Sequence, residues 1–319
     1  MNKPISFIDK MNASVLMLIT PERSMIKKEI AGLGGRLPKS SGIKHIKPEF
    51  MELNGIKIRY AEGGNLDGPT LLMLSPLPQS IVAFDQIWPL LESKYKLVAL
   101  DLPGFGHSEG GMDYMTFKAQ GEFIEAFVKH TGIKNPHVIG PDVGLPAAMY
   151  YAIHCDNDIA SLIIGDGPAI LDTQVGSVIS KMINSAFFRT LFPLVGSGAF
   201  LEAADLLCWL RHTPSDEEMS DYVESYRGRL QPIMKWFKTY PENLKTIDPA
   251  LENLDIPTKI FWGESDVLLD KSDAEKINNR MKRTDMTIFK DCGHFSYQDQ
   301  SDKFAKMLTD WVDSGHQAV

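Results

Sequence analysis

Cysteine is scarce in this chain of 319 residues, which contains only Cys155, Cys208 and Cys292. The three lie far apart in the sequence and form no C-x-x-C pair, so neither a disulfide framework nor a cysteine-based zinc site is expected. Isolated thiols of this kind are usually small buried side chains. The pattern favours a reducing compartment, and we expect a cytoplasmic protein.

An excess of basic residues is also missing. The chain has 33 lysines and arginines against 41 aspartates and glutamates, which gives a formal net charge of −8 at pH 7. A surface that binds nucleic acid needs a basic face or stripe. We therefore expect no nucleic acid among the partners of this protein.

Long apolar runs are absent as well. The most apolar stretch near the N-terminus covers residues 5–19, but Asp9 and Lys10 interrupt it, and no small-residue cleavage site follows. The stretch is too short and too broken for a membrane span or a signal peptide. No stable insertion into a membrane is expected.

Residues 1–48 are predicted to form an N-terminal helical arm. After its first helix, Pro21 and several glycines are predicted to break the chain. We expect the arm to pack on its own body; an arm that joins a homodimer and a helix on a membrane surface are the alternatives. Apolar residues recur at helical spacing in its first part, at Phe7, Met11, Val15 and Leu18.

Strands and helices alternate from residue 49 onward. An Asn54-Gly55 turn joins two short strands within residues 51–60, a typical hairpin signal. The alternation predicts an α/β fold in which a mostly parallel sheet is flanked by helices. Further strands are predicted at 70–74, 97–102, 138–139, 159–164, 259–262 and 286–289, and helices at 84–93, 116–130, 145–154, 272–281 and 302–312.

The alternation stops between residues 168 and 254, where several helical stretches and no strand are found. This pattern predicts a helical cap, or lid, inserted between late strands of the sheet. The core domain would then comprise residues 49–167 and 255–319, with the arm of residues 1–48 in front of it.

A sharp strand-to-helix turn is predicted at Gly140-Pro141-Asp142-Val143-Gly144. An apolar strand precedes this segment and a helix follows it, which is the context of a nucleophile elbow, G-x-Nuc-x-G. The two glycines allow the close approach of chain segments that such a turn requires. The turn lifts the central side chain, Asp142, above the sheet and aims backbone N–H groups of the helix toward it.

Two further side chains complete a possible catalytic triad with Asp142. Asp266 comes just after the predicted strand 259–262, and His294 comes just after the next strand. The order nucleophile, acid, histidine is that of the α/β-hydrolases. Asp166, which follows the strand after the elbow helix, is a rival for the acid, although we favour Asp266.

Over residues 50–314 the chain resembles the α/β-hydrolase superfamily. The segment Asp101-Leu-Pro-Gly-Phe-Gly-His-Ser108 is similar to the D-x-P-G-x-G-x-S segment of epoxide hydrolases and haloalkane dehalogenases. An aspartate at the elbow resembles the same branch. Asp101 itself is expected to shape a loop, and no role is assigned to His107, His130, His137 or His154.

The resemblance implies a mechanism without metal or organic cofactor. Asp142 would attack the substrate and form an alkyl ester, and His294, supported by Asp266, would activate the water that hydrolyses it. Backbone N–H groups of Leu77 and Val143 would form the oxyanion hole.

Several positions depart from the family pattern. Ser75-Pro76 stands where these families carry His-Gly, and Val143 stands where dehalogenases hold a halide with tryptophan. The resemblance also implies a cis peptide bond before Pro78. Epoxide hydrolases use cap tyrosines as proton donors, but Ile233 or Phe237 aligns with the second of them. The possible cap donors are therefore Tyr222, Tyr226, Tyr240 and His212.

The cap is rich in apolar residues, which favours a small hydrophobic substrate. We expect a hydrolase most similar to an epoxide hydrolase; the alternatives are a dehalogenase that acts on an activated carbon–halogen bond and a catalytically silent ligand- or partner-binding relative. The residues expected to line the cap and pocket are Met182, Phe187, Phe188, Leu191, Phe192, Leu206, Leu207, Trp209 and Leu210.

Overall fold

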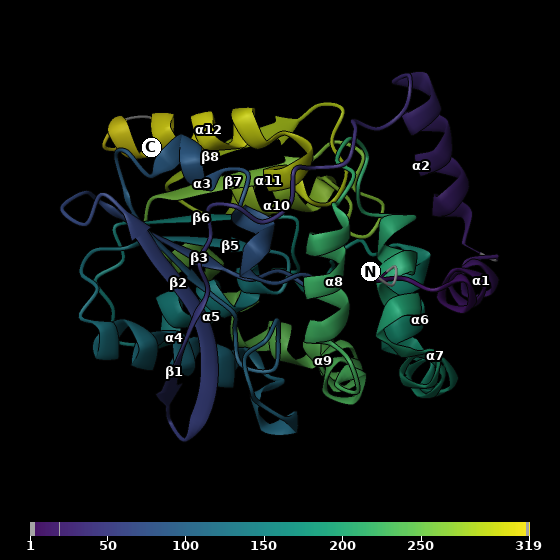
Figure 1. Ribbon diagram of the computed structural model, residues 1–319. Coiled ribbons are helices and arrows are strands. Elements are labelled where there is room, and N and C mark those ends of the chain that lie inside the picture. The colour runs from purple at the N-terminus through teal and green to yellow at the C-terminus, as the bar shows by residue number, and fades with distance from the viewer. Residues whose placement is uncertain (1–3, 19, 317–318) are drawn as a thin grey trace.

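A computed structural model describes residues 4–18, 20–316 and 319, so Ile19 at the end of the broken apolar run lies outside the described residues. An eight-stranded sheet forms its centre, in the order β1-β2-β4-β3-β5-β6-β7-β8 (Figure 1). The pairs β1–β2 and β2–β4 are antiparallel, and all other pairs are parallel. The strands are β1 Glu49–Leu53, β2 Ile56–Gly64, β3 Thr70–Leu74, β4 Lys96–Leu100, β5 His137–Pro141, β6 Ser161–Gly165, β7 Thr258–Gly263 and β8 Thr284–Phe289.

The sequence pattern explains this sheet. Every residue of the central strands β3, β5, β6 and β7 is buried, as expected for parallel strands covered on both faces. The predicted hairpin is confirmed, because Asn54 and Gly55 both have positive φ in the tight turn between β1 and β2. The predicted α/β fold is therefore confirmed.

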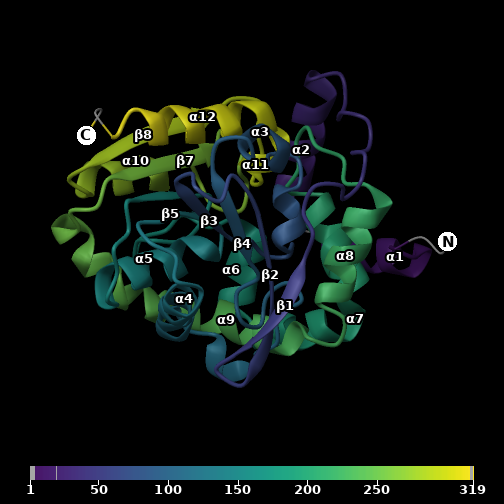
Figure 2. The same ribbon diagram turned by 60° about the vertical axis from the view of Figure 1, so that its left-hand side comes forward.

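Helices cover the sheet on both sides, with α4 and α5 together below it and α3 and α12 above it in both views (Figures 1 and 2). The predicted single helix at 84–93 is wrong. Pro89 favours the first turn of a new helix, so a 3-10 turn at Ile81–Phe84 is followed by the short α3. The bounds are α3 Trp88–Leu91, α4 Phe117–Thr131, α5 Gly144–His154, α10 Ser272–Arg280, α11 Ser296–Asp299 and α12 Ser301–Asp313, with a 3-10 turn at Met112–Tyr114.

Residues 168–254 contain helices that lie to one side of the sheet in Figure 1. α7 is interrupted at Gly196, whose φ of 85° is not helical, three residues after Pro193. None of the helices among the described residues combines the length and apolarity needed to cross a bilayer. The helices are α6 Ser177–Asn184, α7 Ala186–Asp205, α8 Asp216–Ser225 and α9 Leu230–Asn243, followed by 3-10 turns at Leu244–Thr246 and Asp248–Asn253.

The N-terminal arm contains two helices, α1 Phe7–Leu16 and α2 Pro21–Gly32, where the sequence predicted one. Pro21 begins α2 instead of breaking the chain, because proline fits the first helical position, where its missing N–H is not needed. α1 packs on α7, as the arm was expected to pack on its own body. The face of α1 that packs on α7 is not the one with the predicted apolar spacing. Phe7 and Met11 are exposed, and Ala13 and Leu16 are buried.

α2 also contacts α6 through a hydrogen-bonded carboxylate. Glu22 accepts hydrogen bonds from the backbone N–H of Ser177, at 2.6 Å, and from its hydroxyl, at 2.7 Å. Ser177 is the first residue of α6, and the residue before it, Gly176, has no side chain to cap the helix. Glu22 therefore satisfies a free N-terminal donor of α6 from outside that helix.

α8 is fixed to the sheet by a buried ion pair. Asp221 accepts two hydrogen bonds from the Arg59 guanidinium, at 3.1 and 2.8 Å, and its Oδ2 lies 3.2 Å from His107 Nε2. Burial alone would raise the pKa of Asp221, but its contacts with His107 and Arg59 lower it to about 2. The carboxylate therefore stays ionised at neutral pH.

Candidate active site

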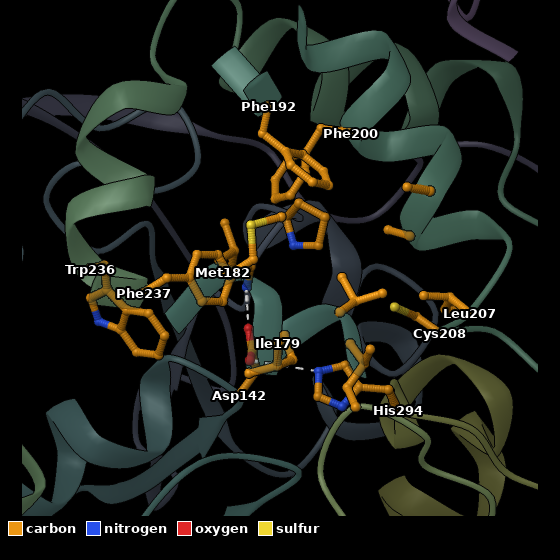
Figure 3. Close-up of a pocket in the computed structure, with 16 residues that line it drawn as sticks. Asp142, Ile179, Met182, Phe192, Phe200, Leu207, Cys208, Trp236, Phe237 and His294 are labelled. Atoms are coloured by element: carbon orange, nitrogen blue, oxygen red, sulfur yellow. Dashed lines mark hydrogen bonds and ion pairs between the residues drawn. The ribbon is translucent and has the colours of Figure 1, made fainter. Parts of the chain in front are cut away.

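Asp142 lies at the turn between β5 and α5. Its φ of 50° is unusual for a residue with a side chain, and its N–H donates to Gly165 O at 3.0 Å. A Cβ atom at Gly140 would lie 2.6 Å from Gly144 O, so the two glycines of the predicted elbow permit this close turn. The turn places the Asp142 carboxylate above the carboxyl edge of the sheet, where a cavity begins (Figure 3).

The Asp142 carboxylate is held on both of its oxygens. Oδ2 accepts a hydrogen bond from the Leu77 N–H at 2.6 Å, and Oδ1 lies 3.6 Å from His294 Nε2 (Figure 3). The next N–H, that of Val143, finds no acceptor among the described residues. The sequence predicted an oxyanion hole formed by the N–H groups of Leu77 and Val143. Leu77 donates its N–H to the Asp142 carboxylate, and Val143 is the residue that follows Asp142 in the chain.

His294 is fully buried between two carboxylates. Its Nδ1 lies 2.7 Å from Asp266 Oδ2, and its backbone N–H donates to Cys208 O at 2.8 Å. Burial would lower the pKa of His294, but Asp266 and Asp142 outweigh burial and raise the pKa well above its usual value. His294 is therefore protonated while both carboxylates are ionised.

The sequence offered Asp266 and Asp166 as alternatives for the acid that supports His294. In the structure these two carboxylates have different hydrogen-bond partners. Asp266 contacts the imidazole through Oδ2, and its Oδ1 accepts from the N–H groups of Leu268, at 2.8 Å, and Leu269, at 3.2 Å. Asp166 accepts from the Gly263 N–H, at 2.8 Å, and the Ser296 hydroxyl, at 2.7 Å. Burial and the nearby Asp266 raise the pKa of Asp166 well above its usual value, which favours a neutral acid there.

The loop that carries Leu77 is held by buried side chains. The Ser75 hydroxyl accepts from the Leu102 N–H at 3.1 Å, and the peptide bond between Leu77 and Pro78 is cis, as expected. Gln79 donates to Gln298 Oε1 and accepts from the Tyr297 hydroxyl, both at 2.5 Å. Ser75 therefore has a structural contact in place of the family's histidine.

An apolar cavity opens above Asp142 and His294 (Figure 3). Among the described residues, these two supply its only charged side chains. Apolar walls cannot satisfy polar substrate groups, so the cavity suits a hydrophobic molecule with one reactive centre. The remaining walls are Leu77, Pro78, Val178, Ile179, Met182, Phe192, Phe200, Ala203, Ala204, Leu207, Cys208, Trp236, Phe237 and Leu268.

Four side chains were considered as cap proton donors, and only one of them borders this region. Tyr240 lines a second small cavity together with Asp142 and His294, and among the described residues its hydroxyl has no hydrogen-bond partner. Tyr226 donates to Gln79 O at 2.9 Å, and Tyr222 accepts from Gln298 at 3.3 Å. His212 Nδ1 lies 3.2 Å from Gln86 Nε2.

Some of the cavity walls were predicted and others were missed. Met182, Phe192 and Leu207 line the cavity as expected. Phe187 does not, because 70% of it is exposed, and Trp209 is buried elsewhere with its indole N–H on Gln298. The missed walls include Phe200, Cys208, Trp236 and Phe237; the helical spacing of Ile233, Trp236, Phe237 and Tyr240 was the available signal.

Cys208 is the one thiol in the cavity wall formed by the described residues. Burial, followed by the charges of Asp266 and Asp142, raises the pKa of Cys208 well above its usual value. A neutral thiol is a poor nucleophile, so Cys208 is poorly suited to attack a substrate in this cavity.

The chain is similar to known proteins over most of its length. The sequence profile of the alpha/beta hydrolase fold matches residues 69–300. A monoacylglycerol lipase of Xenopus laevis is 26% identical over 286 residues, which are 82% of this chain and 83% of the lipase. A soluble epoxide hydrolase of Corynebacterium sp. (strain C12) is 27% identical over 259 residues, covering 76% of this chain and 89% of that enzyme.

The fold is also found among solved structures. The crystal structure of a haloalkane dehalogenase from Bradyrhizobium elkani superimposes with a TM-score of 0.73 at 20% identity, and covers 86% of this chain and 100% of the dehalogenase. At this identity the similarity supports the fold alone.

Proposed function

The chain belongs to the alpha/beta hydrolase fold family and is a hydrolase, and we propose that it works through a covalent alkyl ester on Asp142, with an apolar epoxide as substrate. The observation that carries the proposal is Asp142 itself, because its carboxylate bonds to Leu77 N–H on one oxygen and faces His294 with the other. Asp266 acts as the acid that orients His294.

The residue type at the elbow separates two classes of relative. A serine there would attack an acyl carbon, as ester hydrolysis requires, after losing its proton. A carboxylate that attacks an acyl carbon would form an anhydride, which is a poor route to hydrolysis. A carboxylate can instead displace a leaving group from a saturated carbon, so Asp142 favours epoxide opening over lipase chemistry.

In the first step Asp142 Oδ1 forms a bond to an epoxide carbon, the carbon–oxygen bond of the epoxide breaks, and its oxygen takes a proton from the Tyr240 hydroxyl. The new ester removes the negative charge of Asp142, which is one of the two carboxylates that raise the pKa of His294. His294 can then give up its proton, which passes through water to the Tyr240 phenolate, and act as a base.

In the second step His294 Nε2 takes a proton from water, and the water oxygen attacks the Asp142 carboxyl carbon. Negative charge develops on Oδ2, which already accepts from Leu77 N–H at 2.6 Å. The bond between this carbon and Oδ1 breaks, the diol leaves with Oδ1, and His294 returns the proton. The water oxygen stays on the carboxyl carbon, and its remaining proton passes to His294, which restores the Asp142 carboxylate and the protonated imidazole.

Tyr240 is the donor that we propose for the epoxide oxygen. It lines the cavity region next to Asp142, and burial, followed by Asp273, raises its pKa, so the hydroxyl keeps its proton at neutral pH. We expect Tyr240→Phe to lower kcat on epoxides by about 10²-fold, the scale of general acid catalysis, and to leave alkyl halides unaffected, since halide needs no proton.

Ester formation and ester hydrolysis are measured separately for this variant in single-turnover experiments with styrene oxide. Tyr150→Phe, on α5 away from the cavity walls, serves as the matched control. Unchanged ester formation in Tyr240→Phe, together with a loss in Tyr226→Phe, would assign the donor to Tyr226 instead.

A second prediction distinguishes Asp266 from Asp166 as the acid that supports His294. Asp266→Asn replaces the carboxylate on His294 Nδ1, so ester hydrolysis should slow by about 10⁴-fold while ester formation continues. Asp166→Asn keeps an oxygen for the Gly263 N–H and should change either step by less than about tenfold. Rapid-quench kinetics of both variants test this, and the opposite ranking would make Asp166 the acid.

Dehalogenation is the second candidate. Val143, Leu77 and Pro78 offer no side-chain donor for a leaving halide, but Trp236, whose indole carries an N–H group, is part of the cavity wall. Release of bromide from 1-bromohexane at a rate above that of epoxide opening would favour this function over the first.

A further inference from the structure

Helix α1 carries apolar side chains on two opposite faces. One face is buried against the body and includes Ala13 and Leu16. The other is turned to solvent, with exposed fractions between 51% and 81%. These exposed positions fall within roughly 100° around a helix of 3.6 residues per turn, so they form one stripe. The α1 stripe consists of Phe7, Ile8, Met11 and Val15, and the exposed Leu18 lies in the turn just after the helix.

More exposed apolar residues lie on the helices next to α1. Met25 on α2 is 53% exposed, and Phe187 and Leu194 on α7 are 70% and 78% exposed. Both ribbon views place α1, α2 and α7 at one flank of the molecule (Figures 1 and 2). Of the fourteen large apolar side chains exposed in the described part of the chain, seven belong to these three helices and an eighth, Leu18, directly follows α1. Such a concentration is typical of an interaction surface.

The charge of this flank identifies the partner. Helices α1 and α2 carry four basic residues and three acidic ones, a net +1, and the three acids, Asp9, Glu22 and Glu29, are only partly exposed. Lys10 on α1 and Lys27 and Lys28 on α2 are exposed. A symmetric dimer through the α1 stripe would bring the exposed lysines of two copies together. An anionic lipid surface satisfies both the apolar side chains and the positive charge.

We propose that α1 and α2 dock this protein on an anionic lipid surface, with the α1 stripe in the boundary between headgroups and acyl chains. This inference goes beyond the proposed function, since it requires no turnover. The docked flank is the outer side of the helices that form the apolar cavity, because α1 packs on α7 and Glu22 caps α6. Ile179 and Met182 on α6 and Phe192 and Phe200 on α7 face the inside of that cavity.

Vesicle sedimentation tests the α1 stripe with the full chain. The wild type should bind vesicles of phosphatidylcholine mixed with phosphatidylglycerol at least tenfold more strongly than phosphatidylcholine alone, and high salt should weaken the binding. The double variant Phe7→Gln, Val15→Gln should lose at least tenfold. Leu66→Gln, Leu90→Gln, at positions 64% and 47% exposed away from this flank, is the matched control and should bind as the wild type does.

A variant that lacks two exposed lysines tests whether positive charge contributes to lipid binding. Lys27→Gln, Lys28→Gln should weaken binding to the anionic vesicles about tenfold or more, because each basic residue near such a surface adds about 1 kcal/mol. Lys306→Gln, an exposed lysine on α12, should not. Equal binding to both vesicle types would overturn the proposal. So would a wild-type dimer in analytical ultracentrifugation that binds no vesicles and becomes a monomer in Phe7→Gln, Val15→Gln.

Discussion

The variant His294→Ala is expected to accumulate a covalent adduct on Asp142 when it is exposed to an apolar epoxide. Removing the imidazole leaves Asp142 Oδ1 free to attack but removes the base 3.6 Å from it, so the ester forms and is not hydrolysed. Steady-state turnover should fall by about 10²- to 10⁴-fold. Intact-mass spectrometry after exposure to styrene oxide, 1,2-epoxyoctane and 1-bromohexane measures the adduct.

The size of the adduct identifies the reaction. An increase equal to the whole epoxide mass indicates epoxide opening, and an increase equal to 1-bromohexane less hydrogen bromide indicates dehalogenation. His130→Ala, an exposed position on α4, is the matched control and should show neither adduct nor loss of turnover. Saturable binding of these compounds without any adduct would contradict the ester mechanism and favour the silent binding relative.

Replacement of Asp142, the proposed nucleophile, should have the largest effect on turnover. Asp142→Asn keeps the shape of the side chain and a residue type that tolerates a φ of 50°, so the fold and thermal stability should be retained. The amide is a far weaker nucleophile than the carboxylate, and turnover should fall by at least about 10⁴-fold.

The most informative measurement uses a variant in which Asp142 and His294 are both replaced. The double variant Asp142→Asn, His294→Ala should form no adduct under conditions in which His294→Ala is fully modified. Asp113→Asn, an exposed position in the loop before α4, controls for the loss of one negative charge and should behave as the wild type. An adduct that persists without the Asp142 carboxylate would identify a different nucleophile and contradict the proposed mechanism.

Much of the fold could be predicted from the sequence because its signals are local. The central strands are short, fully apolar runs, and Asn54-Gly55 specifies a hairpin without help from distant residues. The elbow also lies within five consecutive residues. Asp142, Asp266 and His294 each follow a strand, and parallel strands bring their carboxyl ends to one edge of a sheet, so the sequence alone indicates that these side chains meet.

Features set by distant contacts could not be predicted. Asp166 and Asp266 follow the neighbouring strands β6 and β7, and only the bonds to Ser296 and His294 distinguish them. The apolar spacing of α1 did not reveal which face would pack, because the face with Ala13 and the face with Phe7 are both apolar and the partner helix lies about 180 residues later. The apolar spacing of α9 indicates that Trp236 is buried, but only the packing of α9 beside α6 and α7 shows that it faces the same cavity as Phe200.

The hydrogen bonds from Ser177 to Glu22 bear on where a minimal functional unit of this protein would begin. Sequence composition divides the chain near residue 48, which invites treating the first segment as an appendage that can be removed or exchanged. Yet a carboxylate from that segment completes the first turn of α6, and α6 carries Val178, Ile179 and Met182 into the cavity wall. A chain that begins after residue 48 would lack this carboxylate, so the arm belongs to the structural unit that shapes the apolar cavity.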